Sequence, residues 1–200
     1  LLMGSRTMTT DHINALEGQL RECYGRVVYS HKTHEKCADI LLSRHKCIKF
    51  WQIALSAIVT GGIATTLYED WKVVTTVVTT VLSTILLALN AYTKDYDLGE
   101  IAQKHRHSAA DIWLIREKYL SLLTDLRAGS LPLEDIRKNR DALLEELHAT
   151  YKGAPSTDYK AYQKAQKALK ELEDMTFSDE EIDAFLPKEL KRTSKGGGNV

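Results

Sequence analysis

Two apolar stretches near the middle of the chain stand out from its otherwise polar pattern. Residues 50–93 read FWQIALSAIVTGGIATTLYEDWKVVTTVVTTVLSTILLALNAYT, and their only three charged residues lie together in EDWK. As helices, the two uncharged parts would be about 27 Å and about 31 Å long, and a bilayer core is about 30 Å thick. The pattern predicts two transmembrane helices, over about residues 50–68 and 73–93, joined by a short loop into an antiparallel hairpin.

The residues that flank the two stretches favour a membrane over the alternative, a hairpin buried inside a soluble bundle. Burial would require the remaining helices to cover both apolar helices on every side. Aromatic residues concentrate at the two interfaces of a bilayer, and here they stand at both ends of the hairpin: Phe50, Trp51, Tyr68, Trp71, Tyr92 and Tyr96. Basic residues lie before and after the hairpin, whereas the loop holds Lys72 beside Glu69 and Asp70. The positive-inside rule then predicts a multi-pass protein with both termini in the cytoplasm.

The polar segment before the hairpin predicts one helix. Residues 1–9 reach just past a candidate initiator, Met8, and are expected to be a cloning remnant and a disordered start. Residues 10–49 repeat apolar positions at near-helical spacing, which predicts an amphipathic cytoplasmic helix with Gly25 as its candidate break. This helix is expected to lead directly into the first apolar stretch.

The segment after the hairpin, residues 94–186, predicts a cytoplasmic helical region. Its helices are expected to end near Gly129, to cover Leu133–Tyr151 and Tyr159–Met175, and to finish with a short capped helix through Phe185. Residues 187–200 predict a flexible tail. Because no stretch reads as a strand, the expected fold class is an all-α membrane protein, with amphipathic cytoplasmic helices before and after a transmembrane helical hairpin.

Polar residues gather on one side of each apolar stretch. At 100° per residue, the second stretch separates a face rich in Thr and Ser from a face of Val, Ile and Leu. Polar side chains at membrane depth mostly face a cavity or a bundle interior. The candidate pore-lining residues are therefore Gln52, Ser56, Thr60, Thr76, Thr79, Thr80 and Ser83. In the alternative, each hydroxyl donates to the carbonyl oxygen four residues earlier, and these faces only pack between helices.

A ridge of small residues also runs along the first stretch. Ala57, Gly61 and Thr65 recur at intervals of four. Small residues at this spacing let the backbones of two membrane helices approach closely. The ridge is therefore a candidate helix-packing surface.

Charge and composition narrow the function classes. The chain has 27 basic and 27 acidic residues, so its net charge gives no reason to expect nucleic-acid binding. The three cysteines lack CxxC spacing, which favours free thiols. His31 and His34 lie three residues apart beside Glu35, but this spacing is a weak metal signature, and no metal or other cofactor is expected. No catalytic motif is present, and the chain is not expected to be an enzyme.

The layout as a whole resembles a known family. The run KTHEKCADILLSRHKCIKFWQIALSAIVTGGIATT, a minimal loop, a second apolar stretch ending LLALNAYTKDYD, and HRHSAADIWLIREKYLSLL in the following helix are similar to the SLATT domain proteins. These are two-transmembrane effectors associated with nucleotide-producing and nucleotide-sensing partners in bacterial conflict systems. The resemblance covers residues 11–185, and its most specific part is RHKCIKFWQ together with the hairpin.

The resemblance implies a function and a location. It implies a homo-oligomeric pore in the bacterial inner membrane, which depolarises the membrane and kills or arrests an infected cell in antiphage defence. An operon-encoded nucleotide-producing enzyme or reverse transcriptase would supply the trigger. The alternative is a non-conducting membrane scaffold, in contact with lipid, that recruits a cytoplasmic partner.

Overall fold

The computed structural model is all-helical over the residues that it describes, which are 2–65, 72–172, 175–187 and 191. For residues 2–10, 64 and 65 it describes the backbone alone. The helices are α1 (Leu2–Thr65), α2 (Lys72–Asp95), α3 (Leu98–Ala128), α4 (Leu133–Gly153), α5 (Tyr159–Lys170) and α6 (Asp179–Phe185). The expected all-α class is confirmed for this part of the chain. The predicted loop between the apolar stretches and most of the predicted tail lie outside the described residues.

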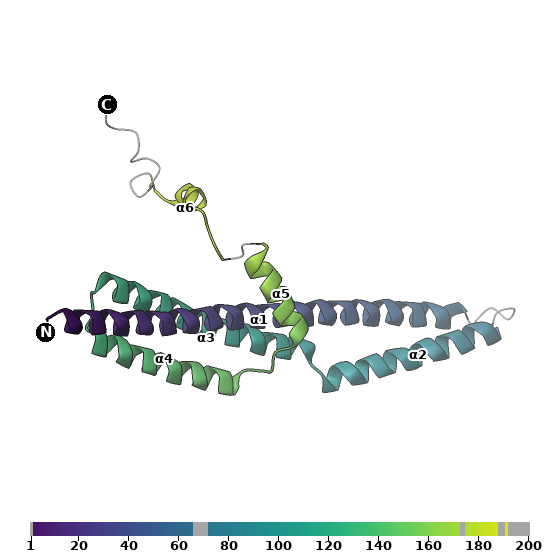
Figure 1. The fold of residues 1–200 in the computed structure, drawn as a ribbon. Coiled ribbons are helices and arrows are strands. Elements are labelled where there is room, and N and C mark those ends of the chain that lie inside the picture. Colours follow the sequence, from purple (N-terminus) through teal and green to yellow (C-terminus); the bar gives the residue numbers. More distant parts are fainter. Residues whose placement is uncertain (1, 66–71, 173–174, 188–190, 192–200) are drawn as a thin grey trace, which may run out of the picture.

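Helix α1 is the axis of the molecule (Figure 1). Its 64 residues span about 96 Å at the helical rise. Helix α2 runs back along the C-terminal part of α1, and α3 continues in the same direction along the N-terminal part. Helix α4 packs on α3, and α5 crosses the middle of α1. The molecule is therefore a long rod, with a three-helix bundle at one end and a two-helix hairpin at the other.

One row of partly or fully buried residues, which we call the α1 seam, runs along the face of α1 that contacts α2 and α3. Its positions alternate in steps of four and three, as in a coiled coil, apart from two successive steps of four around Val27. The seam residues are Leu16, Leu20, Cys23, Val27, His31, His34, Ala38, Leu41, His45, Ile48, Gln52, Leu55, Val59 and Gly62. Because the spacing persists from the bundle into the hairpin, the same face of α1 packs against α3 in the bundle and against α2 in the hairpin.

The apolar core lies in the three-helix bundle. Leu20 and Val27 of α1 are fully buried against Ile112 and Tyr119 of α3 and Ile136 of α4. Large apolar side chains that lose this much contact with water supply most of the stability of a helical bundle. These contacts therefore hold the N-terminal part of α1 in place against α3 and α4.

Local signals set several of the helix boundaries. The Asp97 side chain accepts hydrogen bonds from the backbone N–H groups of Gly99 and Glu100, and α3 begins after a connection of only two residues from α2. Helix α3 ends at Ala128 and is capped by Gly129, whose φ of 63° lies in the left-handed region that favours glycine. Ser178 and Glu181 form the predicted capping box at the start of α6.

Three boundaries differ from the sequence-based expectations. Helix α1 leads directly into the first apolar stretch, as expected, but it runs through the candidate break at Gly25, because no proline interrupts it and its seam is continuous. It also extends back to Leu2, where a disordered start was expected. Helix α5 ends at Lys170, five residues before the predicted end at Met175, whose own φ of 74° is incompatible with a continuing helix.

The described part of the chain contains one helical stretch long and apolar enough to cross a membrane. This stretch begins at Lys72, and none of its apolar part is buried inside the chain. Helix α2, which carries it, has no buried residue. The first predicted span, at the end of α1, stays a prediction.

Shortening a core side chain should destabilise the bundle. We expect Leu20→Ala to lower the free energy of unfolding by about 2–5 kcal/mol, because it leaves a cavity among α1, α3 and α4. Denaturant unfolding of the detergent-solubilised protein measures the change. Leu114→Ala removes a side chain that is 47% exposed and serves as the matched control, and equal losses from both variants would contradict this core.

Candidate functional site

The hairpin of α1 and α2 is an antiparallel pair with its own alternating seam. Residues of α2 at intervals of four and three are partly buried, whereas their neighbours are exposed. They face the end of the α1 seam, which runs through Gln52, Leu55, Val59 and Gly62. The α2 residues are Thr75, Thr79, Leu82, Leu86, Leu89 and Thr93. Because the pattern is that of a coiled coil, the two helices pack side by side along most of α2.

Polar contacts hold the base of this hairpin in register. The Gln52 side-chain amide donates hydrogen bonds to Asn90 Oδ1 at 2.9 Å and to Thr93 Oγ1 at 3.0 Å. Hydrogen bonds between membrane helices contribute about 0.6–2 kcal/mol each. Gln52, a predicted pore residue, therefore lies in the seam of its own hairpin and fixes the alignment of α1 and α2.

The two helices approach each other closely at Gly62. A Cβ atom added there would lie 2.7 Å from Thr79 Oγ1, whereas one added at Gly61 would meet nothing within 4 Å. The predicted ridge is therefore not the contact inside the hairpin: Ala57 and Gly61 are exposed, and the side chain of Thr65 lies outside the description. The two glycines are adjacent in sequence but about 100° apart on the helix, and only Gly62 falls on the seam.

The remaining predicted pore residues come together on one side of the hairpin. Each directly follows a seam residue, and all are exposed: Ser56, Thr60, Thr76, Thr80 and Ser83. In an antiparallel pair of right-handed helices, the positions that follow the seam in both helices lie on the same side of the pair. We call this set the hydroxyl edge. Thr79, like Gln52, is in the seam instead.

The opposite side of the hairpin is apolar. There the exposed residues directly precede seam residues, and they include Ile58 of α1 and Val78, Val81 and Ile85 of α2. The hairpin is therefore more polar on the side of the hydroxyl edge, which also carries three exposed apolar residues that follow the seam: Ile53, Ile63 and Leu87. One edge suits lipid or another apolar surface, and the other suits water or polar groups.

Most hydroxyl groups of the hydroxyl edge are already hydrogen-bonded within their own helix. Thr76 donates to Lys72 O at 2.6 Å, Thr80 to Thr76 O at 2.8 Å and Thr60 to Ser56 O at 2.9 Å. A hydroxyl that donates in this way keeps its oxygen lone pairs as acceptors. The edge can therefore accept hydrogen bonds from water, and it can also lie against lipid or a neighbouring helix with its donors satisfied.

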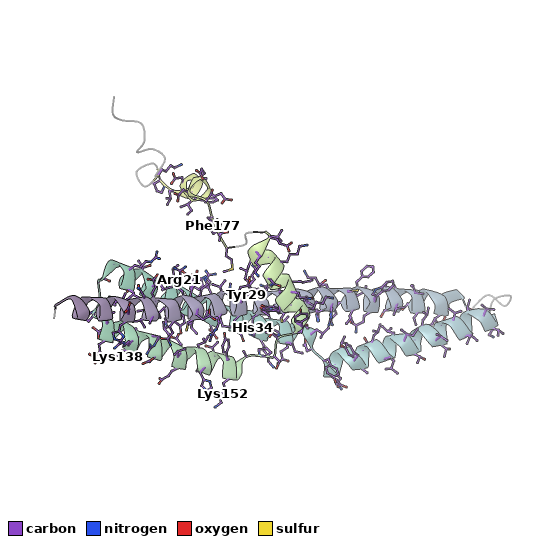
Figure 2. The ribbon with its side chains drawn as sticks, in the orientation of Figure 1. Arg21, Tyr29, His34, Lys138, Lys152 and Phe177 are labelled. Atoms are coloured by element: carbon purple, nitrogen blue, oxygen red, sulfur yellow. The ribbon has the colours of Figure 1, made fainter. Side chains whose placement is uncertain are left out.

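A second unusual feature is a buried polar layer halfway along the rod. Of the buried polar residues in the described part of the chain, all but Asp183 lie in this layer: His31, Lys32, Thr33, His34, His105 and Ser108. Two imidazoles meet at its centre, where His34 Nδ1 lies 3.0 Å from His105 Nδ1. Figure 2 shows His34 where α5 crosses α1. The layer separates the apolar core of the bundle from the hairpin.

Burial keeps the central imidazoles uncharged. Burial, and then the nearby His105 and His31, lower the pKa of His34 to about 4. Burial also lowers the pKa of His105, although Asp158 opposes this shift. With both rings neutral, one Nδ1–H can donate to the other ring. His34 thus pairs with α3 and not with His31, and the described residues contain no group of three or more His, Cys, Asp or Glu side chains placed to hold a metal.

Filling the close approach at Gly62 should force the hairpin apart. We expect Gly62→Leu to destabilise the α1–α2 pair by about 1–3 kcal/mol, because the added side chain overlaps Thr79. Unfolding of the detergent-solubilised protein measures the change. Gly61→Ala adds a side chain in open space, and a larger loss from this control would contradict the seam.

The histidine pair should make the rod sensitive to acid. The folded pKa of His34 lies below its ordinary value of 6.5, so the unfolded chain binds more protons between these values and stability falls as pH drops below about 6.5. We expect a loss of about 1–2 kcal/mol between pH 7 and pH 5. His34→Gln should reduce this loss, whereas the exposed His148→Gln should not. Urea unfolding at the two pH values measures both, and an undiminished acid loss in His34→Gln would contradict the assignment.

Comparisons with known proteins agree with the geometry of the hairpin. Residues 16–181 match the family model described as the SMODS and SLOG-associating 2TM effector domain, family 4. A search of curated proteins finds no match, and neither does a search of solved structures. The match runs from the start of the α1 seam, through the hairpin and the bundle, to the capping box of α6. The chain therefore belongs to SMODS and SLOG-associating 2TM effector domain family 4.

Proposed function

We propose that this membrane effector is an oligomeric pore of bacterial antiphage conflict systems, and that it depolarises the inner membrane of an infected cell. The hydroxyl edge carries the proposal. A hairpin that served only as an anchor would not need polar residues aligned along both of its helices on the same side. The proposal gives the chain no catalytic role and no cofactor.

The difference between the hydroxyl edge and the apolar edge of the hairpin suggests how copies would assemble. One hairpin has two helices and cannot enclose a path, so a pore requires several copies. In a ring, the hydroxyl edge of each copy would face the centre, and the apolar edge, with Val78 and Val81, would face lipid. Gln52 and Thr79 would hold each hairpin together instead of lining the path. Ala57 and Gly61, exposed on the outer face of α1, would let neighbouring hairpins approach.

The bundle and the hairpin would then occupy different compartments. Basic residues flank the base of the hairpin, including Arg44, Lys46 and Lys49 on α1 and Lys94 on α2. These positions favour a cytoplasmic bundle, with both termini on that side of the membrane. An enzyme that makes a nucleotide signal, or a reverse transcriptase encoded nearby, would provide the trigger, and no direct contact with nucleic acid is proposed.

A second function is favoured by one observation. Thr60, Thr76 and Thr80 donate to carbonyl oxygens of their own helices, which satisfies their donors without water. The same edge could therefore pack against another membrane helix in a scaffold that conducts no ions and recruits a cytoplasmic partner. The two functions differ in whether the exposed hydroxyl oxygens contact water.

Removing the hydroxyl groups while keeping side-chain volume distinguishes the two functions. We expect the triple variant Thr76→Val, Thr80→Val, Ser83→Ala to insert and assemble normally, but to reduce ion flux at least tenfold, because a narrow apolar path loses its water. Ion flux from liposomes and membrane depolarisation in expressing cells measure the effect.

The apolar edge provides the control for this experiment. Val78→Thr and Val81→Thr change similar volumes on the side proposed to face lipid, and they should leave ion flux within about twofold of the parent protein. Unchanged flux from the triple variant would remove the hydroxyl edge from the pore. A parent protein that assembles but never conducts would favour the scaffold.

A further inference from the structure

Positive charge stands at one end of the hydroxyl edge, at the base of the hairpin where α2 leads into α3 (Figure 1). Lys46 and Lys49 of α1 each directly follow a residue of the α1 seam, and Lys94 directly follows a seam residue of α2. Positions that follow the seam in both helices lie on the same side of an antiparallel pair. The three lysines, which we call the lysine cluster, are therefore on the side of the hydroxyl edge, and all are exposed.

Hydrogen bonds at the base place the lysine cluster close to one level of the hairpin. Gln52 donates to three acceptors between positions 89 and 93 of α2, so it lies level with about the middle of that segment. Because the helices are antiparallel, three residues back along α1 correspond to three residues forward along α2, which puts Lys49 level with Lys94. Lys46 lies about 4.5 Å closer to the bundle. The cluster thus occupies about one turn of helix.

The charges of the lysine cluster are largely uncompensated. In the part of the chain that the structure describes, none of the three lysines forms an ion pair, and the nearby Glu100 pairs with Lys104 at 2.8 Å. The pKa of Asp97 lies below its ordinary value, first because the backbone of Glu100 donates to it, and also because Lys49 and His45 are positive. Asp97 therefore offsets part of one lysine. Three lysines against this single carboxylate leave a net charge of +2 in each copy.

The other charges at this level are balanced. Arg44 directly precedes a seam residue, which places it on the side of the apolar edge. Asp95 follows the seam residue Thr93 by two positions, about 200° around α2, and so lies on the outer side of the hairpin. One positive and one negative charge cancel there. The excess positive charge of the base is therefore concentrated on the side of the hydroxyl edge.

The hydroxyl edge itself provides no full charge to choose between ions of opposite sign. Residues 50–63 and 73–93 contain no charged residue. The hydroxyl groups of Thr60, Thr76 and Thr80 present oxygen lone pairs, which are dipoles and not whole charges. In the proposed ring of hairpins, the lysine cluster of every copy would surround the cytoplasmic mouth of the path. Walls of low dielectric constant focus the field of such charges and raise the local concentration of ions of opposite sign.

We propose that the lysine cluster makes the pore select small inorganic anions over cations. Rings of Lys or Arg side chains are typical of anion pores, as rings of Asp or Glu are of cation pores. The inference rests on the proposed function, since it assigns the class of ion that the hydroxyl edge would conduct.

Reversal potentials across planar bilayers test the selectivity. With the full-length protein between unequal concentrations of KCl, we expect chloride to be about fivefold more permeant than potassium. The sign of the reversal potential identifies the preferred ion whichever way the protein is inserted. The preference should weaken in about 1 M salt, where charges are screened beyond about 3 Å.

Neutral substitutions show whether the lysine cluster is responsible. The triple variant Lys46→Gln, Lys49→Gln, Lys94→Gln should still assemble and conduct, but its permeability ratio should fall to within about 1.5-fold of unity, because the mouth loses its positive charge. The corresponding triple change to Arg keeps the charge and should keep the ratio of the parent protein. Arg44→Gln removes an exposed positive charge at the same base on the other side, and it should leave the ratio within about 1.5-fold of the parent.

The possible failures are distinguishable. A parent protein that conducts without preference, or that prefers potassium, would overturn the inference and leave the proposed pore standing. A loss of selectivity in Arg44→Gln as large as in the triple Gln variant would assign the effect to the charge of the whole base, and would also overturn it. A parent protein that assembles but passes no ion would overturn the proposed pore, and this inference with it.

Discussion

The structure depends on one face of a single helix. The α1 seam meets α3 in the bundle and α2 in the hairpin, and α2 and α3 follow each other with a two-residue connection. A slip of α1 against α3 would therefore also shift α1 against α2. This coupling explains why polar contacts occur at selected points of the seam. The His34–His105 pair and the Gln52 amide specify one alignment, whereas aliphatic contacts alone would tolerate neighbouring ones.

The two ends of the rod use the same seam with different chemistry. In the bundle, the seam buries large aliphatic and aromatic side chains, and the hydrophobic effect stabilises the contact. In the hairpin, the outer surfaces of both helices remain exposed and mostly apolar, and close packing at Gly62 with hydrogen bonds from Gln52 holds the pair. The second set of forces is the one available to helices in lipid, where burying apolar groups gives no advantage over leaving them in the bilayer.

The sequence predicted the helices better than their contacts. Local signals such as Gly129 and the Ser178–Glu181 capping box depend on a few neighbouring residues, and these predictions are confirmed. The ridge of Ala57, Gly61 and Thr65 stays a prediction, whereas Gly62, which the small-residue spacing did not select, approaches Thr79 of the neighbouring helix closely. The 100° spacing placed Thr79 on the same face as Thr76 and Thr80, and only the position of α1 shows that Thr79 lies in the seam. The meeting of His34 with His105 had no local signal, since it joins positions 71 residues apart.

The continuity of α1 has a mechanical consequence. Helix α1 has no proline and no described break. Its two ends therefore cannot rotate independently about the helix axis without loss of backbone hydrogen bonds. A rotation of α1 within the bundle by one residue step, about 100°, would rotate the part of α1 that lies in the hairpin by the same angle. It would replace each seam position by its neighbour in sequence along the whole length. Any force that turns α1 within the bundle can thus reach the hairpin as torque, over a distance of several nanometres, without a hinge.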